Sequence, residues 1–186
     1  MKRALLFLLL GLAGLSASAQ RVAVQTNVLD WAALGTVNAE LNVAVARHFS
    51  VMAGGRYNPW SFTGHNPECT IMNQHTTAYA GVRYWPWYVH SGWWFAAKGQ
   101  WQEYANTGIW RAALKEGKGG LGGGLSLGYT YMLAKHFNLE FGAGMWVVHY
   151  KEHHFYDSPA KLSVRKEGPA TFVYPDFLSV SFAYVF

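Results

Sequence analysis

Apolar residues recur at every second position in short segments of the chain, which is the period of a β-strand. Between residues 178 and 186 the even positions carry Leu, Val, Phe, Tyr and Phe, whereas the odd positions from 179 to 183 carry only Ser or Ala. The same division into a large apolar face and a small or polar face recurs in residues 37–46, 121–133 and 138–150. Helical spacing is not sustained in any segment, so the pattern predicts an all-β protein.

Segments of this kind are bounded by Gly, Pro, Asn or Asp and predict eight antiparallel strands. They are Val22–Leu29, Val37–Ala46, Ser50–Tyr57, Ala78–Tyr84, Trp93–Tyr104, Leu121–Leu133, Asn138–Tyr150 and Phe177–Phe186. The predicted connections are short at Arg47–Phe49, Trp85–Gly92 and Lys135–Phe137 but long at Asn58–Thr77, Ala105–Gly120 and Lys151–Asp176. An even strand number with short periplasmic turns and longer outer loops is typical of an up-and-down transmembrane β-barrel.

A secreted β-sandwich also has alternating strands, so the placement of charge must distinguish the two folds. Here the polar strand faces carry mostly small residues and only a few charges, which are Glu40, Arg56, Arg83, Lys98 and Glu140. If one of the basic residues faced lipid at the middle of the bilayer, it would destabilise the protein by about 2–4 kcal/mol. We therefore predict that these five residues form a lumen network inside a narrow barrel. Together with Gln100 and Trp146 they would fill its interior, so no diffusion pore is expected.

Five Trp residues are expected near strand ends, where amphipathic rings favour the lipid headgroup layer. They are Trp60, Trp85, Trp87, Trp93 and Trp101. Trp93 and Trp101 share one strand face, and their separation corresponds to a height of about 21 Å for a strand tilted by about 40°. Because an outer-membrane barrel has an apolar band of about 25 Å, we predict that these rings are lipid-interface aromatics.

The start of the chain has the features of an export signal. Lys2 and Arg3 precede an apolar stretch over residues 4–15, and residues 17–19 are Ala-Ser-Ala, which a signal peptidase accepts. The stretch is shorter than the roughly 18 residues that a spanning helix needs. We predict a signal peptide at residues 1–19 and a β-barrel at residues 20–186. The expected location is the bacterial outer membrane, with extracellular loops and periplasmic termini.

Composition excludes several other classes of protein. Charged residues make up 13% of the chain, whereas a soluble domain has about 25%. The mean hydropathy of +0.01 is too low for a helical membrane protein with several spans. Without Lys2 and Arg3, 13 basic and 10 acidic residues leave a net charge of +3, which does not indicate nucleic-acid binding. A single Cys excludes a disulfide scaffold within the chain.

Four stretches of the sequence together resemble a known family. They are Ala19-Gln20, Val-Gln-Thr-Asn-Val-Leu at 24–29, Gly-Gly-Arg-Tyr-Asn-Pro-Trp at 54–60 and Gly-Val-Arg-Tyr-Trp at 81–85. The chain is similar to the small Gram-negative outer-membrane proteins grouped as domain of unknown function 3575. The resemblance implies an eight-stranded barrel like the transmembrane part of outer membrane protein A, and some relatives are associated with fimbrial or adhesin systems. Phe186 resembles the C-terminal signal that the outer-membrane assembly machinery recognises.

The first of the three predicted long links, Asn58–Thr77, carries side chains that are metal ligands by type. They are His65, Glu68, Cys69 and His75. Their spacing matches no zinc pattern, so we predict no metal site and no cofactor. Cys69 can pair with a partner protein or remain a thiol.

A second cluster, at the outer end of the seventh predicted strand, supports an alternative function. It contains His149, Glu152, His153 and His154, with Ser158 nearby. Some eight-stranded barrels modify lipid acyl chains with a His beside a Ser and an acid. However, no segment resembles the His-x-Ser arrangement of the lipid A deacylases, because His90 is followed directly by Ser91. A lipid A acyl hydrolase or transferase therefore remains the alternative to a non-enzymatic barrel.

The remaining outer loops are rich in basic residues, including Arg111, Lys115, Lys118, Lys151, Lys161, Arg165 and Lys166. Cations at headgroup height attract the phosphates of lipopolysaccharide, although a purely solubilising role fits these residues equally well. The sequence thus predicts a non-enzymatic protein with a structural or surface-interaction role. Its expected partners are outer-membrane lipid, the assembly machinery and a surface protein, and not nucleic acid.

Overall fold

The computed structural model describes residues 22–62, 71–107, 113–157 and 164–186. The predicted signal peptide and the candidate residues His65, Glu68, Cys69, Arg111, Ser158 and Lys161 lie outside these ranges. Among the helices of the described residues, none has the length and apolar character needed to cross a membrane.

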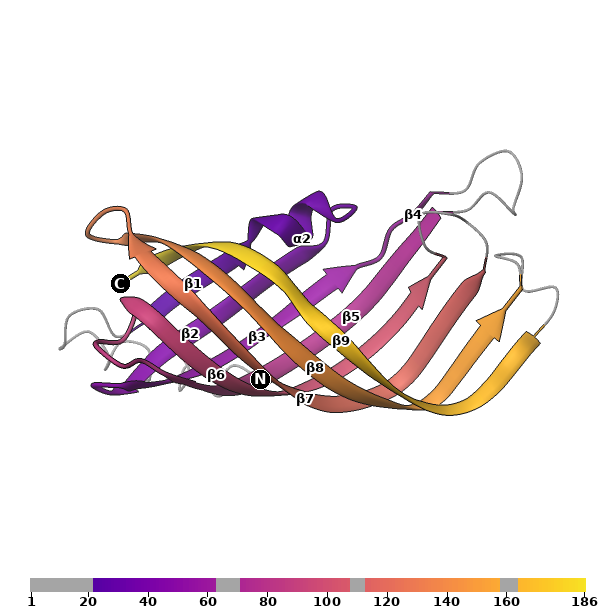
Figure 1. The fold of residues 1–186 in the computed structure, drawn as a ribbon. Coiled ribbons are helices and arrows are strands. Elements are labelled where there is room, and N and C mark those ends of the chain that lie inside the picture. Colours follow the sequence, from indigo (N-terminus) through magenta and orange to yellow (C-terminus); the bar gives the residue numbers. More distant parts are fainter. Residues whose placement is uncertain (1–21, 63–70, 108–112, 158–163) are drawn as a thin grey trace, which may run out of the picture.

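The described residues form nine strands and one short helix. Their bounds are β1 (Val22–Asn27), α2 (Val28–Ala32), β2 (Val37–Ala46), β3 (Phe49–Asn58), β4 (Ser61–Phe62), β5 (Ile71–Tyr84), β6 (Gly92–Asn106), β7 (Leu114–Met132), β8 (Phe137–Tyr156) and β9 (Val164–Val185). Each strand pairs antiparallel with the next in the order β3-β2-β1-β9-β8-β7-β6-β5-β4, and β3 also pairs with β5. Eight of the described strands therefore form a closed ring, and the prediction of an all-β antiparallel fold is confirmed (Figure 1).

Strand positions agree with the predicted pattern, but strand lengths differ on one side of the ring. β2 has the predicted bounds, whereas β5 begins at Ile71, β7 at Leu114 and β9 at Val164. Strand therefore occupies residues 71–77 of the predicted link Asn58–Thr77, 114–120 of Ala105–Gly120 and 164–176 of Lys151–Asp176, so the predicted lengths of these links are wrong. In these extensions polar residues replace the large apolar ones, so the alternating signal fades although the backbone pairing continues.

The two ends of the ring differ, and we call them the turn end and the loop end. The turn end holds the short connections after β2, β5 and β7, together with Phe186, whose backbone N–H donates to the carbonyl of Val22 at 2.9 Å. At the loop end, the long strands β6–β9 extend past the ends of β1–β3 (Figure 1). Helix α2 follows β1 at this end and packs against β9. The sequence pattern missed α2 because five residues are too few to show a helical period.

Large apolar side chains lie on the outside of the ring. Leu41 is 38% exposed, Leu127 49%, Phe141 46% and Phe182 50%. Alternate positions on the same strands point into the ring and are buried, and many of them are polar, including Asn42, Ser126, Glu140 and Ser181. A sandwich would bury the first set between two sheets, so this distribution contradicts the sandwich alternative.

Interior aromatic rings lie against glycines on the neighbouring strands. Trp94 on β6 crosses Gly128 and approaches Gly142, where a Cβ atom would lie 3.0 Å from the ring. Trp146 similarly covers Gly124, and a Cβ there would be 2.5 Å from its Cε3 atom. These glycines give the large rings space inside a narrow ring, which explains why Gly is frequent in β7 and β8.

We expect Gly128→Ala to destabilise the protein by about 1–3 kcal/mol, because its methyl group would collide with the Trp94 ring and the Phe141 carbonyl. Gly99→Ala is the matched control, since the nearest atom to its added methyl is 4.0 Å away. Urea unfolding of the purified protein measures both effects. Equal midpoints for the two variants would contradict the packing role of Gly128.

Candidate functional site

Three of the predicted lumen charges meet in one buried cluster that joins distant walls of the ring. Arg83 extends from β5 between Glu40 of β2 and Glu140 of β8. Its Nη2 donates to Glu40 Oε1 at 2.7 Å, and its Nη1 donates to Glu140 Oε1 at 2.8 Å. Arg83 is 2% exposed, Glu40 6% and Glu140 3%. A buried guanidinium with two charge-assisted partners fixes the spacing of the three strands.

Neutral donors complete this cluster. Gln25 Nε2 donates to Glu40 Oε1 at 3.1 Å and to Glu140 Oε1 at 3.3 Å. The Tyr79 hydroxyl donates to Glu40 Oε2 at 2.8 Å, and the Thr130 hydroxyl donates to Glu140 Oε2 at 3.0 Å. These bonds matter because Arg83 donates to only three of the four carboxylate oxygens and does not reach Glu40 Oε2. Every carboxylate oxygen of the cluster therefore has a donor, as a stable buried polar network requires.

Arg83 also packs against apolar groups that hold its position. Its guanidinium lies over the Trp94 ring, 4.3 Å from the ring centre, and its Nε is 3.2 Å from the Sδ of Met52. Met52 and Trp94 form a buried apolar cluster with Trp85 and Ala96. The charged cluster and this apolar cluster together close the ring near its turn end.

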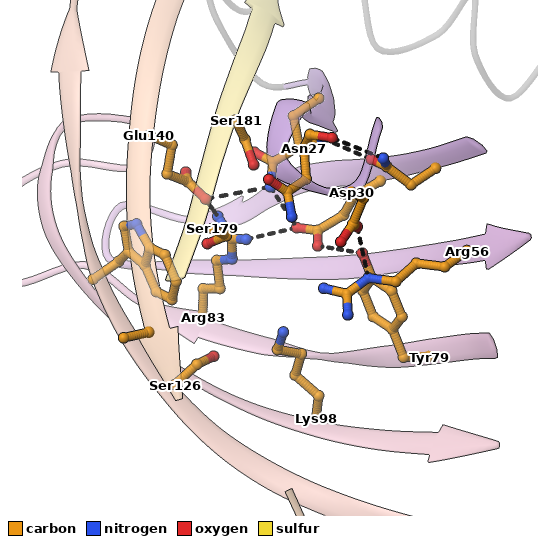
Figure 2. Close-up of a pocket in the computed structure, with 15 residues that line it drawn as sticks. Asn27, Asp30, Arg56, Tyr79, Arg83, Lys98, Ser126, Glu140, Ser179 and Ser181 are labelled. Atoms are coloured by element: carbon orange, nitrogen blue, oxygen red, sulfur yellow. Dashed lines mark hydrogen bonds and ion pairs between the residues drawn. The ribbon is translucent and has the colours of Figure 1, made fainter. Parts of the chain in front are cut away.

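The other two predicted lumen charges lie toward the loop end. Arg56 pairs with Asp30 of α2 at 3.0 Å, and the Lys98 Nζ lies over the rings of Tyr79 and Trp146, 5.1 and 4.7 Å from their centres. All five predicted charges line one cavity, in which the centres of water-sized molecules can occupy about 30 Å³ (Figure 2). The structure thus brings the five residues to one cavity, but it divides them into separate interactions.

The cavity can hold water molecules, since one buried water needs about 10–15 Å³ by this measure. Its described lining has three acidic side chains, Asp30, Glu40 and Glu140, and three basic ones, Arg56, Arg83 and Lys98. Charge is therefore balanced across the cavity without an added ion. In the described residues, no group of three metal-ligating side chains occurs.

Four of the five predicted interface aromatics are exposed, and one is not. Trp60 is 50% exposed, Trp87 53%, Trp93 45% and Trp101 37%. Trp85 is only 1% exposed, and its Nε1 donates to the Ser50 hydroxyl at 2.8 Å inside the ring. The prediction for Trp85 as a lipid-interface ring is therefore wrong. The residue continues the inward-facing positions of β5, whose previous member is Arg83.

The histidines of the predicted outer cluster do not converge. His149 Nδ1 lies 2.8 Å from the Thr171 hydroxyl on the exposed side, and His154 Nε2 pairs with Glu167 at 3.1 Å. His153 is buried and packs against Phe172, with ring centres 4.9 Å apart. His75 lies in β5, which pairs with β3, β4 and β6 and not with β8 or β9. Among the described residues of this cluster, the exposed imidazole–hydroxyl pair is that of His149 with Thr171.

The turn between β5 and β6 contains a histidine with an unusual environment. His90 is 5% exposed and stacks on Trp85 with ring centres 5.8 Å apart. Burial, and then the nearby charge of Arg83, lower the pKa of His90 from 6.5 to about 4. The folded state therefore favours the neutral imidazole, as expected for a buried base.

This shift predicts acid-sensitive stability. Because the folded state binds fewer protons than the unfolded state, the stabilisation is complete above pH 6.5 and is lost as the pH falls toward 4. We expect a loss of about 2 kcal/mol between pH 7 and pH 5, measured by urea unfolding of the purified protein. His90→Asn cannot titrate and should lose much less over this interval. An equal loss in both proteins would assign the acid sensitivity to other groups.

A family model matches nearly the whole chain. The model of a family of proteins of unknown function, DUF3575, covers residues 4–186. A search of the curated proteins found no match to the chain.

Proposed function

The chain belongs to the DUF3575 family, and we propose that it is an eight-stranded β-barrel of the bacterial outer membrane without enzymatic activity. The observation that carries this proposal is the reversed distribution of polarity. Leu125 is 72% exposed and Leu178 72%, whereas Arg83 and Glu140 are buried. Such a ring is stable where hydrocarbon surrounds it, because its exposed apolar surface would be unfavourable in water.

The upper limit of the proposed membrane band follows from strand register. The β6–β7 pairing shifts between Gln102 and Tyr104, and the β8–β9 pairing shifts between Tyr150 and His153. The two register shifts are neighbours in the sheet. Gln102 pairs with Gly120. The β7–β8 register, with Lys118 opposite Glu152 and Leu121 opposite His149, places Gly120 opposite Tyr150. Beyond these shifts, exposed side chains become charged, including Lys118, Lys151 and Glu152. We place the outer membrane–water boundary near this level.

The lower limit is the turn end. Trp87, Tyr88 and Phe137 are exposed there at 53%, 59% and 54%. Arg47 binds the Tyr88 hydroxyl at 3.0 Å, so a base and an aromatic ring lie together where headgroups would meet them. In this orientation the turn end faces the periplasm, and the loop-end extensions of β6–β9 project from the cell.

A structural or surface-interaction role fits these extensions better than transport does. The buried Arg83 cluster and the rings of Trp85 and Trp94 fill the ring, so we propose that no diffusion pore exists. The extensions instead present a large surface at the loop end. The proposed contacts are lipopolysaccharide and a surface protein, with fimbrial or adhesin components as candidates.

Two measurements test the proposal. A closed membrane barrel should migrate faster on detergent gels before boiling than after it, and the protein should stay in the membrane pellet after a carbonate wash. Release into the supernatant would contradict membrane insertion. If it is retained, truncation of the β8–β9 extensions tests surface interaction, since it should reduce binding to the partner surface without changing the gel shift.

One observation favours the alternative of a lipid-modifying enzyme. The exposed Thr171 hydroxyl lies 2.8 Å from His149 Nδ1, close to the proposed outer boundary. An imidazole beside a hydroxyl is the minimum for nucleophilic acyl transfer. Lipid A mass spectra from cells with the natural gene and with His149→Gln should be identical under the main proposal, and a difference in acylation would favour the enzyme.

A further inference from the structure

The short connection between β5 and β6 folds into the ring rather than away from it. Trp85 and His90 are both buried and stack on each other. Trp85 donates to the Ser50 hydroxyl on β3, and Asn138 Nδ2 of β8 donates to the His90 carbonyl at 2.9 Å. Bonds to β3 and β8 therefore hold this turn across the opening at the turn end.

A second, smaller cavity lies between this turn and the Arg83 cluster. Its lining includes Trp85 and His90 on one side, and Arg83 and Glu140 on the other. The centres of water-sized molecules can occupy about 10 Å³ of it, which matches one water molecule.

Two buried side chains of this lining have polar atoms without a protein partner. Asn42 is 1% exposed, and within the described ranges neither its Oδ1 nor its Nδ2 has a hydrogen-bond partner. The same holds for Nε2 of His90, judged against the same part of the chain. Leaving such atoms unsatisfied is unfavourable, because a buried polar group then loses its hydrogen bonds to water without gaining others.

We infer that one buried water molecule occupies this cavity and bridges Asn42 to His90, and that the bridged turn, residues 85–91, is a second seal of the ring. A water both donates and accepts, so it satisfies the amide and the imidazole together. Arg83 disfavours a cation in the same space and Glu140 disfavours an anion. The molecule bound in this cavity is therefore uncharged, as water is.

This seal lies on the turn side of the Arg83 cluster. The small cavity lies between His90 and Arg83, while Trp85 also packs in the apolar cluster that supports Arg83. Solvent that enters from the turn end meets Trp85 and His90 first, whereas solvent from the loop end passes Arg56 and Lys98 before it reaches the Arg83 cluster. The inference rests on the proposed absence of a pore and deepens it, since two layers in series would then block the ring.

Thiol labelling tests the seal directly. Ala183 is 4% exposed and lines the small cavity, so Ala183→Cys, placed in a Cys69→Ser background, reports access to it. We expect a small methanethiosulfonate reagent to leave this thiol unmodified in folded protein in micelles. Removing the turn's rings with Trp85→Ala and His90→Gly should make it reactive. Glycine suits position 90 because His90 has a φ of 65°.

Two controls make the result decisive. Ala134→Cys, an exposed site at the same end, should react in both backgrounds and shows that the reagent reaches it. The gel shift of unboiled protein shows that the ring stays closed. A reactive Cys at 183 with the turn intact, or an unreactive one after its removal, would overturn the seal.

The water and the membrane location are tested separately. A high-resolution crystal structure should show one density peak within hydrogen-bond distance of Asn42 and His90 Nε2, and an empty cavity would overturn the bridge. The thiol-labelling test at position 183 requires a closed ring but does not require that the ring lies in a membrane. Release of the protein by carbonate would therefore refute the outer-membrane proposal while leaving protection at position 183 unchanged.

Discussion

Arg83→Leu is expected to destabilise the protein by about 3–5 kcal/mol, which is the usual cost of leaving a buried charge without its partner. Glu40 and Glu140 would face each other in the interior with only neutral donors. The measurement is the midpoint of unfolding in urea. Under the outer-membrane proposal, a second readout is the amount of protein that assembles in that membrane, which should fall sharply.

The combined variant Glu40→Gln, Arg83→Leu, Glu140→Gln distinguishes charge from shape. It has no buried charge in the cluster, so it should recover most of the stability that Arg83→Leu loses. Arg56→Leu is the surface-side control, because its pair with Asp30 is partly exposed at 22% and 16% and should be worth about 1 kcal/mol or less. Equal losses of stability for Arg56→Leu and Arg83→Leu would show that burial of the cluster does not determine how much it contributes to the free energy of unfolding.

The fold was largely predictable because one physical rule controls it along most of the chain. Each strand alternates between an outer apolar face and an inner polar face, so a period of two locates the strands even without knowledge of their partners. Charged residues such as Glu40, Arg83 and Glu140 are rare on the polar faces. Their convergence follows from a ring that is too narrow to keep inward charges apart.

The partners of these charges were not predictable in the same way. Gln25, Tyr79 and Thr130 complete the cluster, but nothing in their local sequence distinguishes them from other polar strand residues. Asp30 pairs with Arg56 because α2 turns it into the ring, and so short a helix leaves no period. Contacts of this kind depend on strand register, which the alternation alone does not fix.

Trp85 shows a second limit of local patterns. A Trp beside Pro86 and Trp87 at a strand end is typical of a membrane interface, and Trp87 is indeed exposed. The direction of Trp85 is decided instead by the parity of β5, in which Arg83 points inward, and by the Ser50 hydroxyl that accepts its N–H. Parity was available in the sequence and would have placed Trp85 inside.

Leu125→Arg should strongly destabilise the protein in a membrane. This substitution discriminates most sharply between a membrane protein and a soluble one. Leu125 is 72% exposed and pairs with Ala97, which lies midway between Trp93 and Trp101 on β6. An arginine at the bilayer midplane of a barrel costs about 2–4 kcal/mol. In water the same exposed substitution would change stability by about 0.5 kcal/mol or less. The urea midpoint in lipid vesicles measures the difference.

Leu133→Arg is the matched control for depth. Leu133 is 52% exposed and follows β7 at the turn end, where an arginine reaches the headgroup layer and costs about 0–1 kcal/mol. A steep dependence on depth, with Leu125→Arg far more damaging than Leu133→Arg, is what hydrocarbon around the ring requires, because only a low-dielectric layer penalises a charge by its distance from water. Equal and small effects at both positions would place the ring in water and remove the physical basis of the outer-membrane proposal.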